Sequence, residues 1–494
     1  MKARLIIISI LLIFTKQFAG QTNLPSTLDC NEILTIAGSP YIVNTSITIQ
    51  ANCSLTVDAG VEIQMAENTH LIVKGKVDFI GTAAQPIFIH AKDTIWGNIF
   101  LDSTNTQKSI FNYVKIENAR NSIDINQNPA ALYGKYSSLE IKNCYFKNNL
   151  RCIYIYNCPN TLIKSCILDS TNTGEKILGQ YCDNAVVDSS ILYYTHGDCD
   201  AIDFDASKNV VISNNYLYGG DDDGIDIGQT DSVGCDGVTM EGNYIYNFVN
   251  KGISCGEYCV NVDVNYNVIV GCGLGIGAKS GAYVIADHNT LYHNRVGINS
   301  YHHLNQIWGP GHLTVNNSII DDSDTTWNVD PTAFLSVFYS LSNDTLIPGI
   351  GNITGDPMFF SPLPNPSGNF HLLPLSAAVD NGDPAFALDP DGSRSDIGRY
   401  YLNQNTSVTN LNQYREFQII YPNPGNGNFT IRLIPDYKIN TLIVQNILGE
   451  TIWKNDFFGN TREYQIDLSY QSSGIYYLKH YSKNNLSIQK VIIY

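Results

Sequence analysis

Short apolar runs, separated by Asn, Gly and Asp, recur in register through the middle of the chain. One set of positions places an isoleucine every 22 to 30 residues: Ile123, Ile153, Ile177, Ile202, Ile225, Ile253, Ile276 and Ile298. A second set, out of phase with the first, advances by 22 to 28 residues: Cys144, Cys166, Ser190, Asn215, Asn243, Asn267, Asn289 and Asn317. Two sets that advance together indicate a repeat architecture with several short strands in each turn.

These strands are predicted to form a parallel β-helix, because no stretch shows the 3.6-residue period of a helical solenoid. Each coil would bury one side of its strands, and successive coils would stack about 4.8 Å apart. The asparagine positions would line one turn, with their amides hydrogen-bonded along the axis. Cys144 and Cys166 would lie one coil apart, where a disulfide is geometrically allowed but not required.

The rest of the chain divides into further segments. Residues 1–20, "MKARLIIISILLIFTKQFAG", place two basic residues before an apolar run too short for a membrane span, which predicts a secretory signal peptide. Residues 21–325 are predicted to form the helix, and their first coils, such as "SLTVDAGVEIQM", resemble those of bacterial right-handed β-helix proteins. Residues 326–400 are expected to form a loop-rich closing segment, in which "DPDGSRSD" (Asp389, Asp391 and Asp396) favours a turn over a calcium loop.

After a linker at 401–417, residues 418–494 have a different character, with "YPNP", "GIYYL" and "QKVIIY". They resemble the C-terminal sorting domain of the type IX secretion system, a small β-sandwich. The resemblance implies type IX secretion machinery as a partner and export through the outer membrane, with later removal of the domain or attachment at the cell surface. The expected fold is therefore all-β: a right-handed parallel β-helix solenoid followed by a small C-terminal β-sandwich.

Composition narrows the range of partners. The net charge of -17 argues against nucleic acid, whose binding requires Lys and Arg against phosphates, and against an anionic membrane surface. The net charge does not exclude an acidic polymer as a partner, because divalent cations can bridge carboxylates. The 12 cysteines can pair in an exported protein, although their connectivity is not readable from the sequence. We expect a monomer.

Candidate chemistry gathers where the isoleucine positions are aligned. The aligned phrases are "DAIDFD" at 200–205, "DGIDIG" at 223–228, "KGISCG" at 251–256, "LGIGAK" at 274–279 and "VGINSY" at 296–301. Strand alternation places one set of side chains outward: Asp203, Asp226, Ser254, Gly277 and Asn299. Asp200 should then neighbour Asp223 one coil on, and Asp203 should neighbour Asp226. Glycines 224, 228, 252, 256, 275 and 277 would floor a shallow groove, rimmed by Lys279, Tyr301, His302 and His303.

This order of phrases resembles polygalacturonase-type glycosidases, which carry N-T-D-G-I-D, G-D-D, G-H-G-I-S-I-G and R-I-K on successive coils. "CDAID" matches the first at Asp200, and "GDDDGID" matches the second at Asp222 and Asp223. Lys251 stands at the histidine position, and "GIGAK" keeps Lys279 but has Gly277 for the arginine. Without that histidine and arginine, the hydrolase mechanism implied by the resemblance is incomplete.

The acids and lysines also resemble those of pectate-lyase-like enzymes, which bind Ca²⁺ through clustered aspartates and use Lys or Arg to remove a proton. One lyase family carries an Asp on one coil followed by D-D-G-x-D on the next. The predicted metal ligands are Asp200, Asp203, Asp223 and Asp226, with Ca²⁺ as the ion. The predicted catalytic residues are Lys251, Lys279, Asp222 and Asp223, and the predicted substrate-binding residues are Tyr301, Ser254 and Asn299.

Three functional hypotheses follow. The first is an exported, Ca²⁺-dependent lyase that acts on an acidic polysaccharide such as a polyuronate. The second is a non-catalytic surface β-helix that binds glycan or has a structural role, and the third is a polygalacturonase-like hydrolase. For the acid cluster itself, the alternative is a solvated acidic turn, since Asp is a common turn former. For Lys251, an ion pair with Asp223 is the alternative to catalysis.

Overall fold

The computed structural model describes residues 20–104, 107–120, 130–169, 174–303, 308–404, 418–433, 441–446, 450–456, 463–482 and 485–493. Residues 1–19 of the predicted signal peptide and 405–417 of the predicted linker lie outside them. The described chain consists of β-strands and one 3-10 turn at Ile36–Gly38. None of its helices has the length and apolar character needed to cross a bilayer. The prediction of an all-β protein is confirmed.

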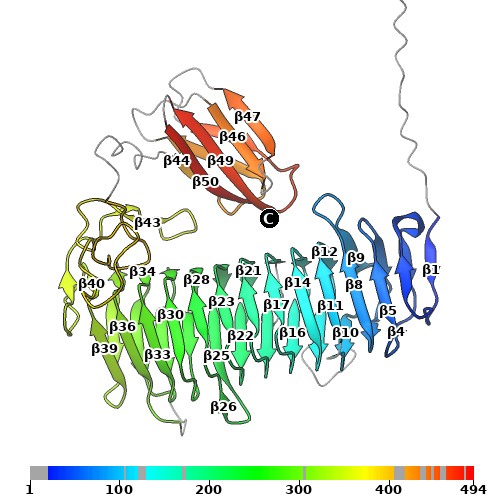
Figure 1. Cartoon of the computed structure of the whole chain (residues 1–494), viewed down its shortest axis with the longest axis horizontal. Coiled ribbons are helices and arrows are strands. Elements are labelled where there is room, and N and C mark those ends of the chain that lie inside the picture. Colours follow the sequence, from blue (N-terminus) through cyan, green and yellow to red (C-terminus); the bar gives the residue numbers. More distant parts are fainter. Residues whose placement is uncertain are drawn as a thin grey trace, which may run out of the picture.

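Three long parallel sheets form the solenoid, and the chain visits them in turn (Figure 1). Sheet A contains β1 (Thr22–Leu24), β3 (Tyr41–Val43), β6 (Glu62–Met65), β9 (Ile87–Ala91), β12 (Val114–Glu117), β15 (Tyr145–Lys147), β18 (Ile167–Asp169), β21 (Ile191–Thr195), β24 (Tyr216–Gly220), β28 (Tyr244–Phe248), β31 (Val268–Val270), β34 (Thr290–Tyr292), β37 (Ile319–Asp321), β40 (Leu341–Ser342) and β41 (Ile353–Thr354). Sheet B contains β2 (Glu32–Leu34), β5 (Ser54–Val57), β8 (Lys76–Ile80), β11 (Lys108–Asn112), β14 (Ser138–Lys142), β17 (Leu162–Lys164), β20 (Val186–Asp188), β23 (Val211–Ser213), β27 (Thr239–Glu241), β30 (Val262–Asn265), β33 (Tyr283–Asp287), β36 (His312–Asn316) and β39 (Phe334–Phe338).

Sheet C carries the candidate site. It contains β4 (Ile47–Ile49), β7 (Leu71–Val73), β10 (Ile99–Asp102), β13 (Leu132–Lys135), β16 (Ile153–Tyr156), β19 (Ile177–Gln180), β22 (Ile202–Asp205), β25 (Ile225–Thr230), β29 (Lys251–Cys255), β32 (Leu274–Lys279), β35 (Val296–Tyr301) and β38 (Thr325–Val329). A short strand, β26 (Val233–Gly234), folds back antiparallel on the end of β25.

The isoleucine positions pair as predicted from Ile153 to Ile298, and every one of these side chains is buried in the core. The predicted first step, from Ile123 to Ile153, is wrong: Ile153 pairs with Leu132 on the preceding coil. Ile123, the predicted partner, lies outside the described residues. Strands β38 to β41 extend all three sheets past residue 325, into the predicted closing segment of the β-helix.

The asparagine ladder forms inside one turn, as predicted. The side-chain oxygens of Asn243, Asn267 and Asn289 each accept the backbone N–H and the side-chain amide of the asparagine one coil earlier. The next member is Ser318, whose hydroxyl accepts the Asn289 N–H, and not Asn317. Asn317 has a positive φ of 43° and its amide donates to Asp287 instead. The ladder satisfies polar groups that would otherwise be buried without partners.

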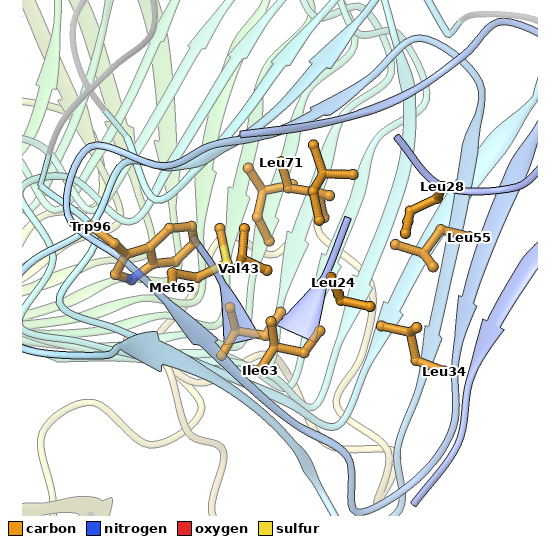
Figure 2. Close-up of a pocket in the computed structure, with 12 residues that line it drawn as sticks. Leu24, Leu28, Leu34, Val43, Leu55, Ile63, Met65, Leu71 and Trp96 are labelled. Atoms are coloured by element: carbon orange, nitrogen blue, oxygen red, sulfur yellow. The ribbon is translucent and has the colours of Figure 1, made fainter. Parts of the chain in front are cut away.

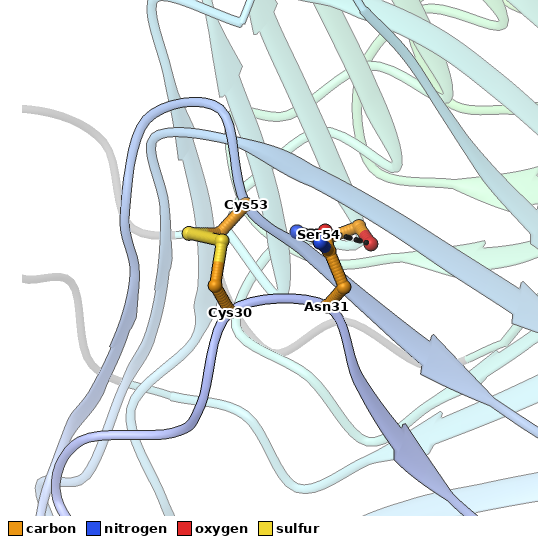
Figure 3. The surroundings of a disulfide bond; sticks show 4 residues. All are labelled: Cys30, Asn31, Cys53 and Ser54. Atoms are coloured by element: carbon orange, nitrogen blue, oxygen red, sulfur yellow. Dashed lines mark hydrogen bonds between the residues drawn. A yellow bond between two sulfur atoms is a disulfide. The ribbon is translucent and has the colours of Figure 1, made fainter.

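One disulfide, Cys30–Cys53, joins the first coils, beside hydrogen bonds from Ser54 to the Asn31 side chain (Figure 3). The other ten cysteines are free thiols, and Cys144 and Cys166 are among them. Figure 2 shows a space in the core near the N-terminal end of the helix. It is lined only by apolar side chains such as Leu24, Leu34 and Trp96, so it is part of the hydrophobic core and offers no polar ligand-binding groups.

The helix is followed by an antiparallel pair, β42 (Phe359–Ser361) and β43 (Asn369–Leu372). The C-terminal domain then forms two small antiparallel sheets: β44 (Gln418–Tyr421), β45 (Asn428–Leu433) and β48 (Glu463–Asp467); and β47 (Thr451–Asp456), β46 (Thr441–Asn446), β49 (Gly474–Ser482) and β50 (Asn485–Ile493).

The C-terminal domain lies alongside the helix (Figure 1) and contacts the outer face of sheet A. Ile492 on β50 is buried against Ile167, Ile191 and Tyr193. The Lys490 ammonium lies 4.8 Å from the centroid of the Tyr216 ring. The last strand of the chain therefore covers an apolar strip of the helix.

Candidate active site

The predicted acids meet at the start of β22 and β25. The backbone N–H of Asp223 donates to Oδ1 of Asp200 at 2.9 Å, and the N–H of Ala201 donates to the Asp223 carbonyl. One oxygen from each of Asp200, Asp222 and Asp223 lies within 4.8 Å of the others. Asp222 is half-buried and accepts a hydrogen bond from Asn250 at 2.7 Å. The prediction that neighbouring coils bring these carboxylates together is confirmed.

On the adjacent coils, the residues at the same position form ion pairs. Arg151 pairs with Glu175 on the coils before the cluster, and Lys251 pairs with Asp223. The Lys251 ammonium donates to both Asp223 oxygens, at 2.8 and 3.1 Å, and its backbone N–H donates to one of them. Asp200 lies between these two pairs and forms no ion pair with any described residue. It is therefore the uncompensated charge of this column.

Burial and mutual repulsion shift the protonation of these acids. Burial, and then the charges of neighbouring aspartates, raises the pKa of Asp200 well above its ordinary value. The same causes raise the pKa of Asp203 well above normal. Burial and Asp226 raise the pKa of Asp223 to about 6, although Lys251 offsets part of the effect. Burial and mutual repulsion therefore favour the protonated form of these carboxyl groups.

The outward column on sheet C has the predicted register: Asp203 pairs with Asp226, and Ser254, Gly277 and Asn299 follow. Oδ1 of Asp226 is buried and has no hydrogen-bond partner. Asn299 is half-buried. Ser254 has no exposed surface, so its predicted role in binding substrate needs correction: its hydroxyl is not accessible in this structure.

The glycine floor is also only partly as predicted. Glycines 224, 252 and 275 face the core: a Cβ on Gly252 would lie 2.4 Å from a methyl group of Ile269. Glycines 228, 256 and 277 do face outward, but two of them are covered by lysine side chains. A Cβ on Gly256 would lie 2.5 Å from Cε of Lys279, and one on Gly277 would lie 3.5 Å from Cδ of Lys251. The missing side chains therefore make room for two lysines, which form part of the floor.

The two lysines differ in their partners. Lys279 Nζ lies 3.9 Å from a Glu257 oxygen, a much looser contact than the pair made by Lys251. Burial lowers the pKa of Lys279, but Asp226 and Glu257 outweigh it and hold that pKa above its ordinary value. The Tyr301 hydroxyl belongs to the same group: burial raises its pKa, and both lysines oppose that rise.

Glu257 was not identified from the sequence. It follows β29 in a turn, with a positive φ of 42°, and a Cβ on Gly228 would lie 3.1 Å from its carboxylate. That backbone conformation interrupts the alternation of the strand, so no periodic signal could have placed it on the groove. Burial raises its pKa, with Lys279 opposing.

The four predicted ligands differ in the contacts that already occupy their carboxylates. Asp223 is committed to Lys251, whose positive charge would oppose a metal ion. Asp200, Asp203 and Asp226 form no ion pair among the described residues, and Asp226 offers a buried oxygen without a partner. Ca²⁺ takes six to eight oxygens, and three carboxylates supply up to six. Of the predicted ligands, Asp200 and Asp223 lie in a group of described acids whose oxygens are within 4.8 Å of one another, with Asp222 as its third member.

Two other predicted groups lie elsewhere. The carboxylates of Asp389, Asp391 and Asp396 accept backbone N–H groups of their own segment, which is the arrangement of a turn. His302 is half-buried, and His303 is exposed.

The fold and the tail define the class of protein. Residues 87–236 match the family described as right handed beta helix region, and residues 419–494 match the secretion system C-terminal sorting domain. The chain therefore contains a right-handed β-helix region and a sorting domain, which indicates export by type IX secretion to the cell surface or the extracellular space.

Several solved structures are similar to this chain, and their names describe proteins that act on polysaccharides. The periplasmic alginate epimerase AlgG is 13% identical, with 63% of this chain and 84% of that chain covered and a TM-score of 0.45. Pectate lyase Pel9A is 13% identical, with 72% and 89% covered and a TM-score of 0.38. The catalytic domain of a GH87 alpha-1,3-glucanase is 13% identical, with 63% and 68% covered and a TM-score of 0.38. A search by sequence against curated proteins finds no match.

Proposed function

We propose that the protein is a cation-assisted polysaccharide lyase that acts on a polyuronate along sheet C. The observation that carries the proposal is the buried Asp226 oxygen without a hydrogen-bond partner, on the strand next to Asp203 and beside the loosely paired Lys279, with Asp200 close by at the start of β22. Bound by these carboxylates, Ca²⁺ would neutralise the uronate carboxylate and acidify the proton α to it.

Lys279 is the better candidate base of the two lysines. Lys251 is held by two short contacts to Asp223, so it positions that carboxylate and keeps its own proton. Lys279 has only the 3.9 Å contact to Glu257, and Asp226 is a main contributor to its raised pKa. Once the charge of Asp226 is compensated, the Lys279 amine can lose its proton and act as a base.

The elimination balances with the groups present. The Lys279 amine takes the proton α to the uronate carboxylate, and the bond from the β-carbon to the glycosidic oxygen breaks. A carbon–carbon double bond forms between the α-carbon and the β-carbon. The leaving oxygen takes a proton from water or from Tyr301, which then regains a proton from solvent, and Lys279 returns its proton to solvent.

A hydrolase is the second candidate, because Asp200, Asp222 and Asp223 converge within 4.8 Å and the pKa of Asp223 is raised to about 6. A carboxyl group with a pKa near 6 keeps its proton in mildly acidic solution and can there protonate a leaving oxygen, while an ionised neighbour can activate water.

The test incubates the purified protein with polygalacturonate and with alginate, in Ca²⁺ or in EDTA. Ultraviolet absorbance of an unsaturated product, lost in EDTA and in Lys279→Ala but kept in the exposed control Lys208→Ala, is the expected result. New reducing ends without that absorbance would refute the lyase proposal and support the hydrolase. Glycan binding without either product would indicate a binding protein.

A further inference from the structure

Two open clefts lie at the C-terminal end of the helix, near β40 and β43 in Figure 1. The first cleft has a volume of about 440 Å³ and the second a volume of about 490 Å³, and Asp322 lines both, so the two meet there. Their shared wall consists of the ends of β28, β31, β34, β37 and β40 and the turns that follow these strands. Neighbouring strands of sheet A are about 4.8 Å apart, so the four spacings make this wall roughly 19 Å long. The described residues that line the clefts include none of the candidate site on sheet C.

The opposite wall is formed by the segment that follows the helix. Pro362 and Leu373 border the first cleft, and Pro364 borders the second. The Phe359 ring packs edge-on against the Tyr292 ring, with centroids 6.1 Å apart, inside a larger apolar cluster. Because this contact joins the segment to β34, the two walls of the first cleft belong to one packed unit, and the outer wall offers apolar surface.

Polar side chains line the place where the clefts meet. Nδ1 of His293 lies 2.8 Å from an Asp322 oxygen, and the two side chains are 54% and 52% exposed. The Tyr292 hydroxyl also hydrogen-bonds to Asp322, and burial and then the charge of that carboxylate raise the pKa of Tyr292 to about 12. A carboxylate has about four acceptor positions, so Asp322 can still accept hydrogen bonds from a ligand.

The acids of the clefts are placed for hydrogen bonds and not for chelation. Those that line the clefts are Asp321, Asp322, Asp324, Asp344 and Asp356. No three of these described acids bring their oxygens within 4.8 Å of one another, so they do not form a three-carboxylate metal site. The carboxylates of Asp344 and Asp356 each accept a backbone N–H, at 3.2 and 2.7 Å.

The charge of the clefts selects the class of ligand. The five aspartates outnumber the two basic side chains that line the clefts, Arg295 and His293. A polyuronate would therefore meet like charges and be disfavoured. Sugar hydroxyl groups can donate to ionised carboxylates, which only accept hydrogen bonds, and the C–H faces of sugar rings match the apolar wall of Pro362 and Leu373. The ligand that suits both walls is a neutral oligosaccharide.

We propose that the two clefts form one binding site for a neutral oligosaccharide, which lies across the coils with its middle at Asp322. Asp344 accepts its hydroxyl groups in the first cleft, and Asp324 accepts them in the second. The site is separate from sheet C and takes a different class of glycan from the polyuronate proposed there. The protein thus binds a neutral polysaccharide at the C-terminal end of its helix, independently of any reaction on sheet C.

Affinity electrophoresis of the full chain tests this site without cleavage. The net charge of -17 carries the protein through a native gel that contains a soluble neutral polysaccharide, either β-glucan, galactomannan or starch. At least one of these polymers should retard the wild type, and Asp322→Ala should weaken that binding about tenfold or more, because it removes hydrogen bonds to a charged group. Asp263→Ala is the matched control, since Asp263 is exposed on β30 of sheet B, outside the clefts, and its loss should leave binding unchanged. Retardation by none of the three polymers, or equal affinity of Asp322→Ala and the wild type, would overturn the proposal.

Two further variants test whether one ligand spans both clefts. Asp344 lines only the first cleft and Asp324 only the second, and both are exposed, so replacing either by Ala should leave the thermal unfolding midpoint unchanged. Each replacement alone should weaken binding of the polymer that retards the wild type. Weaker binding in only one of the two variants would refute the single site. Retardation by polylysine and by no neutral polymer, lost in Asp322→Ala, would show that the clefts take a cationic partner instead. Because the assay involves no cleavage, every one of these outcomes leaves the lyase proposal to its own test.

Discussion

Replacing Asp200 by Asn should stabilise the protein at alkaline pH. Asp200 lies between the Arg151–Glu175 pair and the Lys251–Asp223 pair and has no ion pair of its own among the described residues. Its folded-state pKa is raised above the unfolded value near 3.9, so the native state binds this proton more tightly than the unfolded state. Its contribution to stability is therefore greatest below that unfolded value and is lost progressively as the pH rises towards the folded pKa.

The size of the effect follows from the separation of the charges. Two unit charges 4.8 Å apart repel by about 3 kcal/mol at an effective dielectric constant near 20. The Asn side chain removes this repulsion and can still accept the hydrogen bond from the Asp223 N–H. We expect a gain of up to about 3 kcal/mol at pH 8 and almost none near pH 4.

Thermal unfolding in EDTA at the two pH values measures this difference. Asp221→Asn is the matched control, because it makes the same change in the corresponding loop of the next coil, at a side chain that is 57% exposed. A loss of stability in Asp200→Asn at pH 8, or an equal gain at both pH values, would refute the reasoning.

The remaining predictions concern the cation, the ion pair and the ladder. Adding Ca²⁺ at about 100 times its dissociation constant should stabilise the wild type by about 2.7 kcal/mol and leave Asp226→Asn unaffected in thermal unfolding, whereas equal shifts would argue against this site. Lys251→Met should cost about 3–5 kcal/mol at pH 8, because Asp223 stays buried without its partner. The loss should shrink at pH 5, where Asp223 (pKa about 6) takes up a proton, and urea midpoints that drop equally at both pH values would contradict this. Asn243→Ala should cost at least about 2 kcal/mol, since it leaves buried polar groups without partners, whereas the exposed Asn343→Ala should change the urea midpoint little.

The repeat predicted the fold well because strand registers are fixed by burial. A shift of one residue would turn Ile202 or Ile225 outward, so their spacing shows which residues stack. The same register placed Asp200 beside Asp223 and Asp203 beside Asp226. The step from Ile123 failed because a spacing of 30 residues exceeded the actual spacing of 21 between Leu132 and Ile153.

What the sequence could not supply is the behaviour of turns and long side chains. Glu257 reaches the groove from a turn of positive φ, where strand alternation no longer applies. Lys279 lies along Gly256, so glycines expected to leave open space are covered. Ser254 is outward by register yet buried, because register gives the direction of a side chain and not what lies above it.

The contact between β50 and sheet A has a consequence for the exported protein. Ile492 keeps water away from Ile167, Ile191 and Tyr193. A chain cut in the linker before residue 418 would lose this cover and display an apolar strip on the side of its helix. The sorting domain therefore also covers an apolar surface of the helix during export. Its removal would expose that surface and change which molecules the exported protein can bind.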